Sequence, residues 1–495
     1  MLLVGGALMV AGLAAALAAG RLRVPGLVLF LGLGMAIGTD GTGWLDFDDY
    51  ELARTIGIVA LVLILFEGGL SAGWQEIRPV LRESLSLALL GTLGTAAIAG
   101  FAGKLLLDLS TLEGLLLGSI VAATDGAAIF GVLRGSTLRR RLARTLEGEA
   151  GFNDPVAIVL VLGFIEWIQQ PDYGALDMLL LFGRELGVGL VVGLAVGWLG
   201  LQGLRRARLG TPGAYPLGTV GIAAIAYGAA DTLEGSGFLA VYLAGLALGS
   251  ATFPAQQAVT IFHQGLGWVA QVTMFLVLGL LVFPSELGDI ALEGTLLAVV
   301  LAFVARPVSA MVATAFSGYS LGERVVLGWA GLRGAVPVVL ATFPVIEEVP
   351  GSQEFFNVVF FAVLLSTVLQ GSTFELLAKW LGITTEDPAL DREPSLRRAG
   401  STAVVSSIRA WTKADGNAAY PRAVAGRKVT KQLRARLDEP GALVVLDDGR
   451  YAFTGKVLAL GSASALQTLA RGRLERASTN AEREWWREVI GELAH

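Results

Sequence analysis

The chain contains no cysteine and only two histidines, His263 and His495, among its 495 residues. Without cysteine there is no disulfide, no thiol nucleophile and no thiolate ligand for a metal ion. Two histidines so far apart in the sequence also argue against a histidine zinc site or a Ser-His-Asp triad. We therefore expect neither enzymatic activity nor a cofactor.

Charged residues are also scarce: they make up 16% of the chain, whereas soluble domains carry about 25%. Hydrophobic residues account for 54%, and the 65 glycines are typical of membrane helices, which use small residues for close packing. The net charge of -5 is mild, and no basic patch indicates a nucleic-acid partner. This composition predicts an all-α polytopic membrane protein whose first partner is the lipid bilayer.

Apolar segments separated by short charged loops predict about thirteen transmembrane helices. They lie near residues 2–20, 24–38, 55–72, 84–106, 112–133, 146–168, 178–203, 215–231, 236–251, 264–283, 290–316, 323–343 and 355–382. The first segment lacks a basic leader and runs straight into the second, so we expect a helix there and not a cleaved signal peptide.

The charges of the loops alternate along the chain. Arginines gather near residues 21–23, 78–82, 134–144 and 205–208, and the loops between them contain mainly aspartate and glutamate. Under the positive-inside rule, this pattern predicts a multi-pass protein of the cell membrane with its N-terminus outside and its C-terminus in the cytoplasm.

The composition changes at the end of the last span, so residues 1–383 form the expected transmembrane domain. Residues 384–400 are charged and contain proline, which is typical of a linker. Residues 401–495 predict a small cytosolic α+β domain with a hairpin over 442–460 and a helix over 463–492.

The span over 146–168 carries carboxylates that the bilayer disfavours. Its purely apolar part is too short to cross alone, because a span needs about 20 residues. The helix is therefore expected to begin near Leu146 and to hold Glu149, Asn153 and Asp154 within the membrane. A carboxylate at such depth is costly and by default marks an ion or proton pathway.

An alternative interpretation makes Asp154 the N-cap of a helix that starts at Pro155, which is a common arrangement. The length of the span opposes it, and so does the four-residue spacing of Glu149 and Asn153, which places them on one helix face. If Pro155 lies inside the helix, it frees the carbonyl of Gly151 for a cation or a water molecule.

Two spans in opposite halves of the chain are interrupted in the same way. In 112–133 and in 323–343 a charged residue, Asp125 or Arg333, is followed directly by Gly-Ala. Paired interruptions of this kind indicate an inverted-repeat transporter with its site near the bilayer midplane. Asp125 and Arg333 would compensate the partial charges of the broken helix ends. The alternative is that two glycine-rich spans merely look alike.

Three further polar residues lie in apolar surroundings. Glu67 is either part of the site or an interfacial residue near the end of its helix. Arg306 is expected to organise the site or to be the buried partner of a carboxylate. His263 is expected at the membrane interface.

Together these residues identify a resemblance to the monovalent cation:proton antiporter-1 family of the NhaP type, nearest its potassium/proton branch. The resemblance covers the third to the thirteenth span. The matching segments are Leu65-Phe66-Glu67-Gly68-Gly69-Leu70, Ala123-Thr124-Asp125, Glu149 with Asn153-Asp154-Pro155, Gly237-Phe238-Leu239-Ala240-Val241-Tyr242 and Gly331-Leu332-Arg333-Gly334-Ala335.

The resemblance implies roles for the residues around the carboxylate. Asp154 would bind cation and proton alternately, and Glu149 and Arg333 would hold Asn153 in place. Because Asn153 stands where electrogenic relatives have a second aspartate, the resemblance also implies one proton per cation. It further implies a homodimer and a regulatory role for residues 401–495, with a small molecule as the candidate ligand.

The resemblance places Thr124 and Glu67 at the cation, together with Asp125 of the same helix break. In this family a serine often follows the site glutamate and its hydroxyl contacts the ion, but here the residue is Ala150. The preference between K⁺ and Na⁺ is therefore open.

The expected function is secondary active exchange of K⁺ or Na⁺ for H⁺ without net charge movement. A buried carboxylate needs a compensating proton or cation, so the two would compete for Asp154. The alternatives are a ligand-gated potassium efflux system, a cation channel of the same fold, and a membrane enzyme. The first usually has a glycine-rich nucleotide fingerprint, and none follows residue 382. A membrane enzyme would need a catalytic triad or a phosphate-binding loop, and the sequence contains neither.

Overall fold

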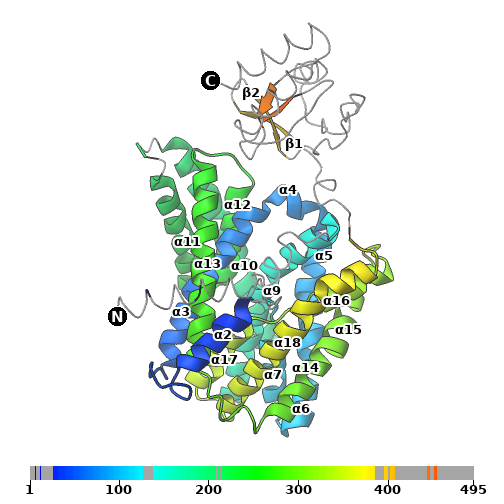
Figure 1. The fold of residues 1–495 in the computed structure, drawn as a ribbon. Coiled ribbons are helices and arrows are strands. Elements are labelled where there is room, and N and C mark those ends of the chain that lie inside the picture. The colour runs from blue at the N-terminus through cyan, green and yellow to red at the C-terminus, as the bar shows by residue number, and fades with distance from the viewer. Residues whose placement is uncertain are drawn as a thin grey trace. The chain divides into compact units, whose positions relative to one another are not determined.

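The computed structural model describes residues 6, 12, 26–125, 138–207, 210–211, 213–384, 395–399, 402–406, 443–445 and 451–453. The chain divides into two compact units, Met1–Thr384 and Thr385–His495. The described part of the first unit is almost entirely helical (Figure 1).

The helices of the first unit follow one another with short connections. They are α2 (Gly26–Ile37), α3 (Tyr50–Ala72), α4 (Trp74–Ile77), η1 (Arg78–Val80), α5 (Leu81–Ser86), η2 (Leu87–Gly91), α6 (Thr92–Leu107), α7 (Thr111–Ala122), α9 (Arg140–Gln169), α10 (Ala175–Arg206), α11 (Ala214–Thr232), α12 (Gly237–Gly249), α13 (Gln256–Leu280), α14 (Ala291–Val300), η3 (Leu301–Ala305), α15 (Arg306–Ala313), α16 (Leu321–Trp329), α17 (Ala335–Ile346) and α18 (Ser352–Trp380).

Seven helical runs among the described residues are long and apolar enough to cross a membrane, and four shorter apolar helices accompany them. Helix α10 has a largely exposed apolar surface: only 17% of its most hydrophobic 18-residue stretch is buried inside the protein. Leu190, Val191 and Trp198 on this helix are exposed. Apolar residues in such number on an exposed face are typical of contact with lipid.

From residue 24 onward the expected spans coincide with helices over most of their described length, apart mainly from the breaks near Asp125 and Arg333, which confirms the all-α polytopic fold of the first unit. The first expected span, 2–20, lies outside the described residues except for Gly6 and Gly12, so the count of thirteen stays a prediction.

The expected arginine loop near 78–82 is wrong, because α4, η1 and α5 fill this segment with helix. The chain turns at Gly73, which has a φ of 65°, and then resumes a helical path. Pro79 does not prevent this, because it lies in the first turn of η1, where its missing N–H has no partner to lose.

Two groups of helices make up the first unit. The α3 group consists of α2, α3, α10, α11, α12 and α13, and the α9 group consists of α5, α6, α7, α9, α14, α15, α16, α17 and α18. Figure 1 shows α11, α12 and α13 on one side and α14, α15 and α16 on the other. At the boundary, α3 of the first group packs against α9 and α17 of the second, and α10 and α12 pack against α9.

Glycines allow α3 and α12 to approach until their backbones touch. A Cβ at Gly69 would lie 2.4 Å from the carbonyl oxygen of Tyr242, and one at Gly245 would lie 2.5 Å from that of Phe66. Both distances are far inside contact, so only glycine fits at these positions. The close contact fixes the wall that α3 and α12 present to the α9 group.

The described part of the second unit is a four-stranded sheet of β1 (Ser395–Ala399), β2 (Thr402–Ser406), β3 (Leu443–Val445) and β4 (Tyr451–Phe453) in this order. β1 pairs with β2 and β3 with β4 in antiparallel fashion, whereas β2 and β3 are parallel.

β1 lies inside the segment predicted to be a linker, and that part of the prediction is wrong. In the sequence, Gly-Ser separates the residues of β1 from those of β2, and this pair is a sequence signal for a hairpin. The linker was predicted because the segment is rich in charged residues and contains proline. The helix expected over 463–492 lies outside the described residues.

The packing of α12 on α3 predicts that Gly245→Ala destabilises the protein. The added methyl would meet a backbone oxygen that cannot rotate away, and overpacking of this kind costs about 1–3 kcal/mol. We expect a lower midpoint of thermal unfolding in detergent. The matched control is Gly221→Ala on α11, where nothing lies within 4 Å and the methyl only favours the helix. Equal midpoints for the two variants would contradict the packing argument.

Candidate cation-binding site

Asp154 lies inside a continuous helix. α9 runs from Arg140 to Gln169 with Pro155 in its interior, so the interpretation of Asp154 as a helix N-cap is wrong. The helix begins six residues earlier than Leu146, in the expected arginine loop. Asp154 is 2% exposed, and its Oδ1 atom accepts no hydrogen bond from the described residues. An unpaired carboxylate oxygen at such burial indicates a ligand.

Two helix breaks meet beside α9. α7 ends at Ala122 and the chain continues without helix to Asp125, while α16 ends at Trp329 and α17 starts at Ala335. The breaks touch, because the N–H of Asp125 donates to the carbonyl of Leu332 at 2.9 Å. The interruption between α16 and α17 is thus confirmed, and the break after α7 is seen as far as Asp125; residues 126–137 lie outside the described residues.

The same capping pattern starts α7 and α16. Ser110 with Glu113 and Ser320 with Glu323 each form a capping box, in which the serine side chain accepts from the glutamate N–H and the glutamate accepts from the serine N–H. Both helices therefore have a defined start and a defined interruption, as expected of two copies of one repeat.

Charged side chains cover the exposed ends of the broken helices. Nη1 of Arg333 donates to the carbonyls of Ala122 and Ala123 at 2.7 and 2.9 Å, at the negative end of α7. Oδ2 of Asp125 accepts from the N–H of Ala335 at 3.1 Å, at the positive end of α17. The expected compensation of helix-end charges is confirmed. Gly334 is required here, because a Cβ would lie 1.7 Å from that same carboxylate oxygen.

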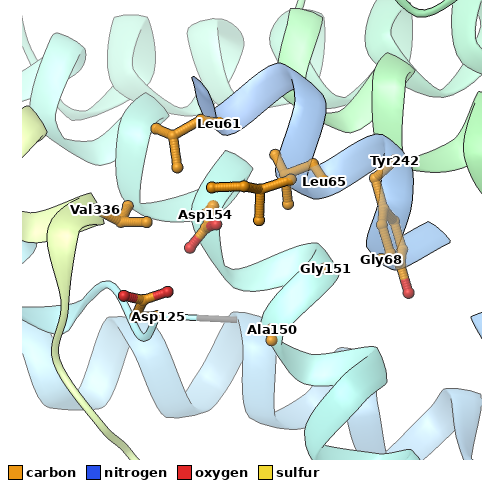
Figure 2. Close-up of a pocket in the computed structure, with 10 residues that line it drawn as sticks. Leu61, Leu65, Gly68, Asp125, Ala150, Gly151, Asp154, Tyr242 and Val336 are labelled. Atoms are coloured by element: carbon orange, nitrogen blue, oxygen red, sulfur yellow. The ribbon is translucent and has the colours of Figure 1, made fainter. Parts of the chain in front are cut away.

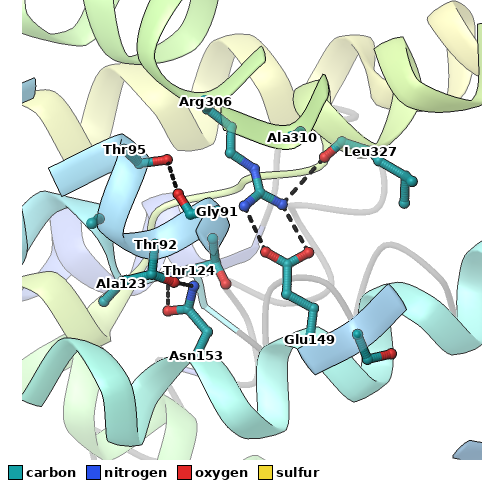
Figure 3. Close-up of polar contacts among 12 residues, drawn as sticks. Gly91, Thr92, Thr95, Ala123, Thr124, Glu149, Asn153, Arg306, Ala310 and Leu327 are labelled. Carbon is teal, nitrogen blue, oxygen red and sulfur yellow. Dashed lines mark hydrogen bonds and ion pairs between the residues drawn. The ribbon is translucent and has the colours of Figure 1, made fainter. Parts of the chain in front are cut away.

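Asn153 connects α9 to the break after α7 (Figure 3). Its Nδ2 donates to Oγ1 of Thr92 at 2.7 Å, and its Oδ1 accepts from the N–H of Thr124 at 3.1 Å. The implied contact of Glu149 and Arg333 with Asn153 is wrong. Arg333 is directed to the carbonyls of the break, and Glu149 has another partner.

That partner is Arg306. Its Nη1 lies 2.6 Å from Oε1 of Glu149 and its Nη2 lies 2.8 Å from Oε2, which gives a bidentate pair (Figure 3). Arg306 is 1% exposed and Glu149 is not exposed at all. Arg306 also donates to the carbonyl of Leu327 at 3.3 Å. It is thus the expected buried partner of a carboxylate, and it organises the α9 group.

Thr92 was missed by sequence reasoning, and it shares an unusual backbone feature with Arg306. Each residue directly follows a π-helical turn, η2 or η3, and its N–H donates to a carbonyl five residues earlier, Leu87 for Thr92 and Leu301 for Arg306. A π turn re-aims the side chains that follow it and is frequent at functional sites. The only signal in the sequence was a polar residue inside an apolar span.

A small cavity lies where α3 and α12 face α9, the α7 break and α17. It is lined by Leu61, Ile64, Leu65, Gly68, Asp125, Ala150, Gly151, Asp154, Tyr242 and Val336. Figure 2 shows the carboxylates of Asp154 and Asp125 pointing into it. The space measures about 10 Å³, which is close to what one water molecule needs. One small ion therefore fits beside the two carboxylates.

Thr124 and Glu67 lie near this cavity but do not line it. Oγ1 of Thr124 is buried without a hydrogen-bond partner, next in sequence to Asp125. On α3 the lining residues 61, 64, 65 and 68 share one helix face, and Glu67 lies off it. Glu67 accepts from Oγ of Ser71 at 2.9 Å and lies near Gly267 of α13.

The expected interfacial position of His263 is wrong. His263 has no exposed surface; its Nε2 lies 2.8 Å from Oγ1 of Thr219, and its ring packs against Phe66 at 4.9 Å between centroids. Its neighbour Phe262 on the same helix is exposed.

Two helix breaks that meet beside a buried carboxylate are typical of secondary transporters. Comparison with known proteins agrees: the family model for the transmembrane sodium/hydrogen exchanger matches residues 7–380. The chain belongs to this family, and it is a multi-pass membrane protein of the NhaP type.

Among its relatives, the K(+)/H(+) antiporter NhaP2 of Shewanella baltica is 39% identical over 362 residues, which are 72% of this chain and 63% of the relative. The chain thus spans less than two thirds of that relative. The K(+)/H(+) antiporter NhaP of Alkalimonas amylolytica is 36% identical over 419 residues, 84% of this chain and 72% of the relative. The structure of the sodium proton antiporter MjNhaP1 from Methanocaldococcus jannaschii at pH 8 superposes with a TM-score of 0.67 at 25% identity, over 77% of this chain and 99% of that one.

The buried pair predicts a non-additive response to mutation. Arg306→Gln leaves the charge of Glu149 buried and unpaired, which costs about 3–5 kcal/mol. Adding Glu149→Gln removes that charge, so we expect the double variant to unfold at a higher temperature than Arg306→Gln alone. The measurement is thermal unfolding in detergent of the four members of the cycle. Additive losses would show that the two side chains do not stabilise each other.

Proposed function

We propose that the protein exchanges a monovalent cation, K⁺ or Na⁺, for H⁺ across the cell membrane. One observation supports this above all: Asp154 keeps a buried carboxylate oxygen without a hydrogen bond, in a cavity at the meeting point of two helix breaks. In such a place the carboxylate needs a compensating proton or cation. The two therefore compete for one group.

The position of the cavity supports alternating access. Leu61, Leu65 and Tyr242 line it from the α3 group, while Asp154 and Val336 line it from the α9 group (Figure 2). Movement of one group against the other opens the cavity to one side of the membrane or the other. If the groups move only when Asp154 holds a proton or a cation, exchange is obligatory.

Oxygen atoms are the ligands available to a hard cation in this cavity. Asp154 provides an unpaired oxygen, Thr124 has an unpaired hydroxyl close by, and Pro155 frees the carbonyl of Gly151. The names of the NhaP2 and NhaP relatives favour K⁺, whereas that of MjNhaP1 favours Na⁺. Both ions therefore belong in the first assay.

We further propose that the exchange is electroneutral. Of the two carboxylates that line the cavity, Asp125 is engaged by the N-terminus of α17, and Asn153 is uncharged. Asp154 is then the single exchangeable group, and one proton leaves for each cation that binds.

The surrounding assignments follow from the charge pattern and the family. We propose a cell-membrane protein with its N-terminus outside and its C-terminus in the cytoplasm, because arginine-rich segments alternate with acidic segments along the sequence. We propose a transmembrane exchanger domain over 1–383, a homodimer as the assembly, and a regulatory role for 401–495 with a small molecule as ligand.

Asp154→Asn tests the proposed exchange directly. The amide cannot take up a proton at neutral pH or balance a cation, so we expect loss of cation-dependent dissipation of a pH gradient in proteoliposomes. Asn153→Asp is the informative partner variant, because it keeps Asp154 and adds a second titratable carboxylate beside it. Unimpaired exchange by a correctly folded Asp154→Asn protein would end the proposal.

Electroneutrality is tested by clamping the voltage. With equal K⁺ on both sides and valinomycin present, the membrane potential stays near zero. We expect the rate of pH-gradient dissipation to be the same with and without valinomycin, because no net charge moves. Acceleration by the clamp would indicate electrogenic exchange. Cation flux without any coupled proton movement would favour a channel.

A further inference from the structure

Tyr242 carries a buried hydroxyl that none of the contacts described above explains. The residue belongs to α12, is 1% exposed and lines the cavity. Figure 2 shows its hydroxyl directed away from the carboxylates of Asp154 and Asp125. The oxygen has no hydrogen-bond partner among the described residues. A hydroxyl buried in this way costs free energy, which is recovered if the ring moves toward water.

The ring of Tyr242 covers one face of α9. A Cβ at Gly151 would lie 2.1 Å from Cζ, 2.3 Å from Cε2 and 2.6 Å from Cε1, so the hydroxyl-bearing half of the ring rests directly on this glycine. The ring of Phe152 meets it edge to face at 5.2 Å. Gly151 stands three residues before Asp154, and residues at this spacing share a helix face. The ring therefore lies on the face that carries the carboxylate, one turn toward the start of α9.

A charged and partly exposed segment of α9 lies beyond the ring. Glu147 is one further turn toward the helix start, on the same face, and its carboxylate is the charge that acts on the Tyr242 hydroxyl. Glu147 pairs with Arg144, and these two side chains are 15% and 25% exposed. Arg144 also pairs with Glu76 of α4 at 3.0 Å. The arginine-rich end of α9 is thus polar and partly open to water.

In the other direction the same face of α9 is apolar. Ala157, Ile158 and Val161 follow Asp154 at helical spacing, and all three are buried. The two turns after Asp154 thus present apolar side chains on this face, whereas the turns before it lead to Glu147. An ion or water molecule that moves along α9 from the polar end to Asp154 meets the ring of Tyr242 first.

We propose that Tyr242 is the gate between the cavity and the arginine-rich end of α9. The inference rests on the proposed exchange function and extends it by naming the barrier on one access route. The backbone of Tyr242 is held against α3, because a Cβ at Gly69 would lie 2.4 Å from its carbonyl oxygen. The ring therefore leaves Gly151 by rotating, or by moving with the α3 group away from α9. Either movement opens the cavity to the polar end and hydrates the hydroxyl.

The hydroxyl without a partner makes this gate easier to open. Closing the ring on Gly151 buries the hydroxyl unsatisfied, whereas opening lets water bind it. Two substitutions of the same residue are therefore expected to act in opposite directions. Tyr242→Phe keeps the ring and removes the buried hydroxyl, so it favours the closed gate. Tyr242→Ala removes the ring, so it leaves the passage open.

The test uses a single thiol in the cavity. The chain contains no cysteine, so Ala150→Cys introduces one thiol, at a position that lines the cavity and is 1% exposed. Its rate of modification by a positively charged, membrane-impermeant methanethiosulfonate is measured in proteoliposomes. We expect Tyr242→Phe to slow the modification roughly tenfold, as for the relief of one buried unpaired polar group. We expect Tyr242→Ala to accelerate it.

Two controls fix the route. Tyr227 lies on α11, packs against Phe238 and does not line the cavity, so we expect Tyr227→Phe and Tyr227→Ala to leave the rate unchanged. Thr252→Cys marks the arginine-rich end, since Thr252 is exposed and its carbonyl accepts from Arg205. We expect the Tyr242 substitutions to change the modification from the vesicle face that labels Thr252→Cys.

An unchanged or accelerated rate in Tyr242→Phe would overturn the gate, because a loss of packing alone does not slow access to a buried thiol. Effects confined to the opposite vesicle face would overturn it as well. If Tyr242→Ala does not fold, Tyr242→Leu takes its place as the shorter apolar side chain. Modification does not require transport, so a wild type that fails to exchange cation for proton ends the antiport proposal, while these rates still decide the role of Tyr242.

Discussion

The arrangement depends on how broken helices satisfy their backbone groups without water. In a membrane each interrupted helix leaves N–H and C=O groups that have no solvent to bind. Here the two interruptions meet and satisfy each other: Arg333 binds the carbonyls that end α7, and Asp125 binds the N–H that begins α17. The close approach at Gly334 is part of this solution. The cavity and Asp154 lie beside this contact between the two helix breaks.

Most of the buried charges near the crossing are engaged in structure. Arg306 and Glu149 neutralise each other in a bidentate pair, and Asn153 fixes the α7 break to α6 and α9. This leaves an unpaired oxygen on Asp154 in the cavity. This difference is expected of an exchanger, because a carboxylate that exchanges ions must release its proton or cation, whereas the side chains that hold the helices in place must keep their hydrogen bonds and ion pairs.

The cavity lies between the two helix groups and is walled by both. On one wall, glycines bring α3 and α12 into backbone contact, so that wall acts as one unit. On the other, α9 and the crossing are tied together by Asn153 and by the two π turns that aim Thr92 and Arg306. The proposed exchange would place its ion between these two walls, so that their relative movement opens the site to one side of the membrane or the other.

Periodicity and span length in the sequence determined the helices, the two interruptions and the burial of Asp154 within α9, because the bilayer fixes how long an apolar helix must be. Which buried side chains contact one another was decided only by the tertiary structure. The sequence placed Glu149, Arg306 and Arg333 in the membrane but did not pair them, because the pairing depends on which helices cross. The position of Thr92 depends on a π turn. The directions of Glu67, away from the cavity, and of His263, into the protein interior, depend on how their helices are rotated. Those features arise from packing between distant segments, which a local pattern does not encode.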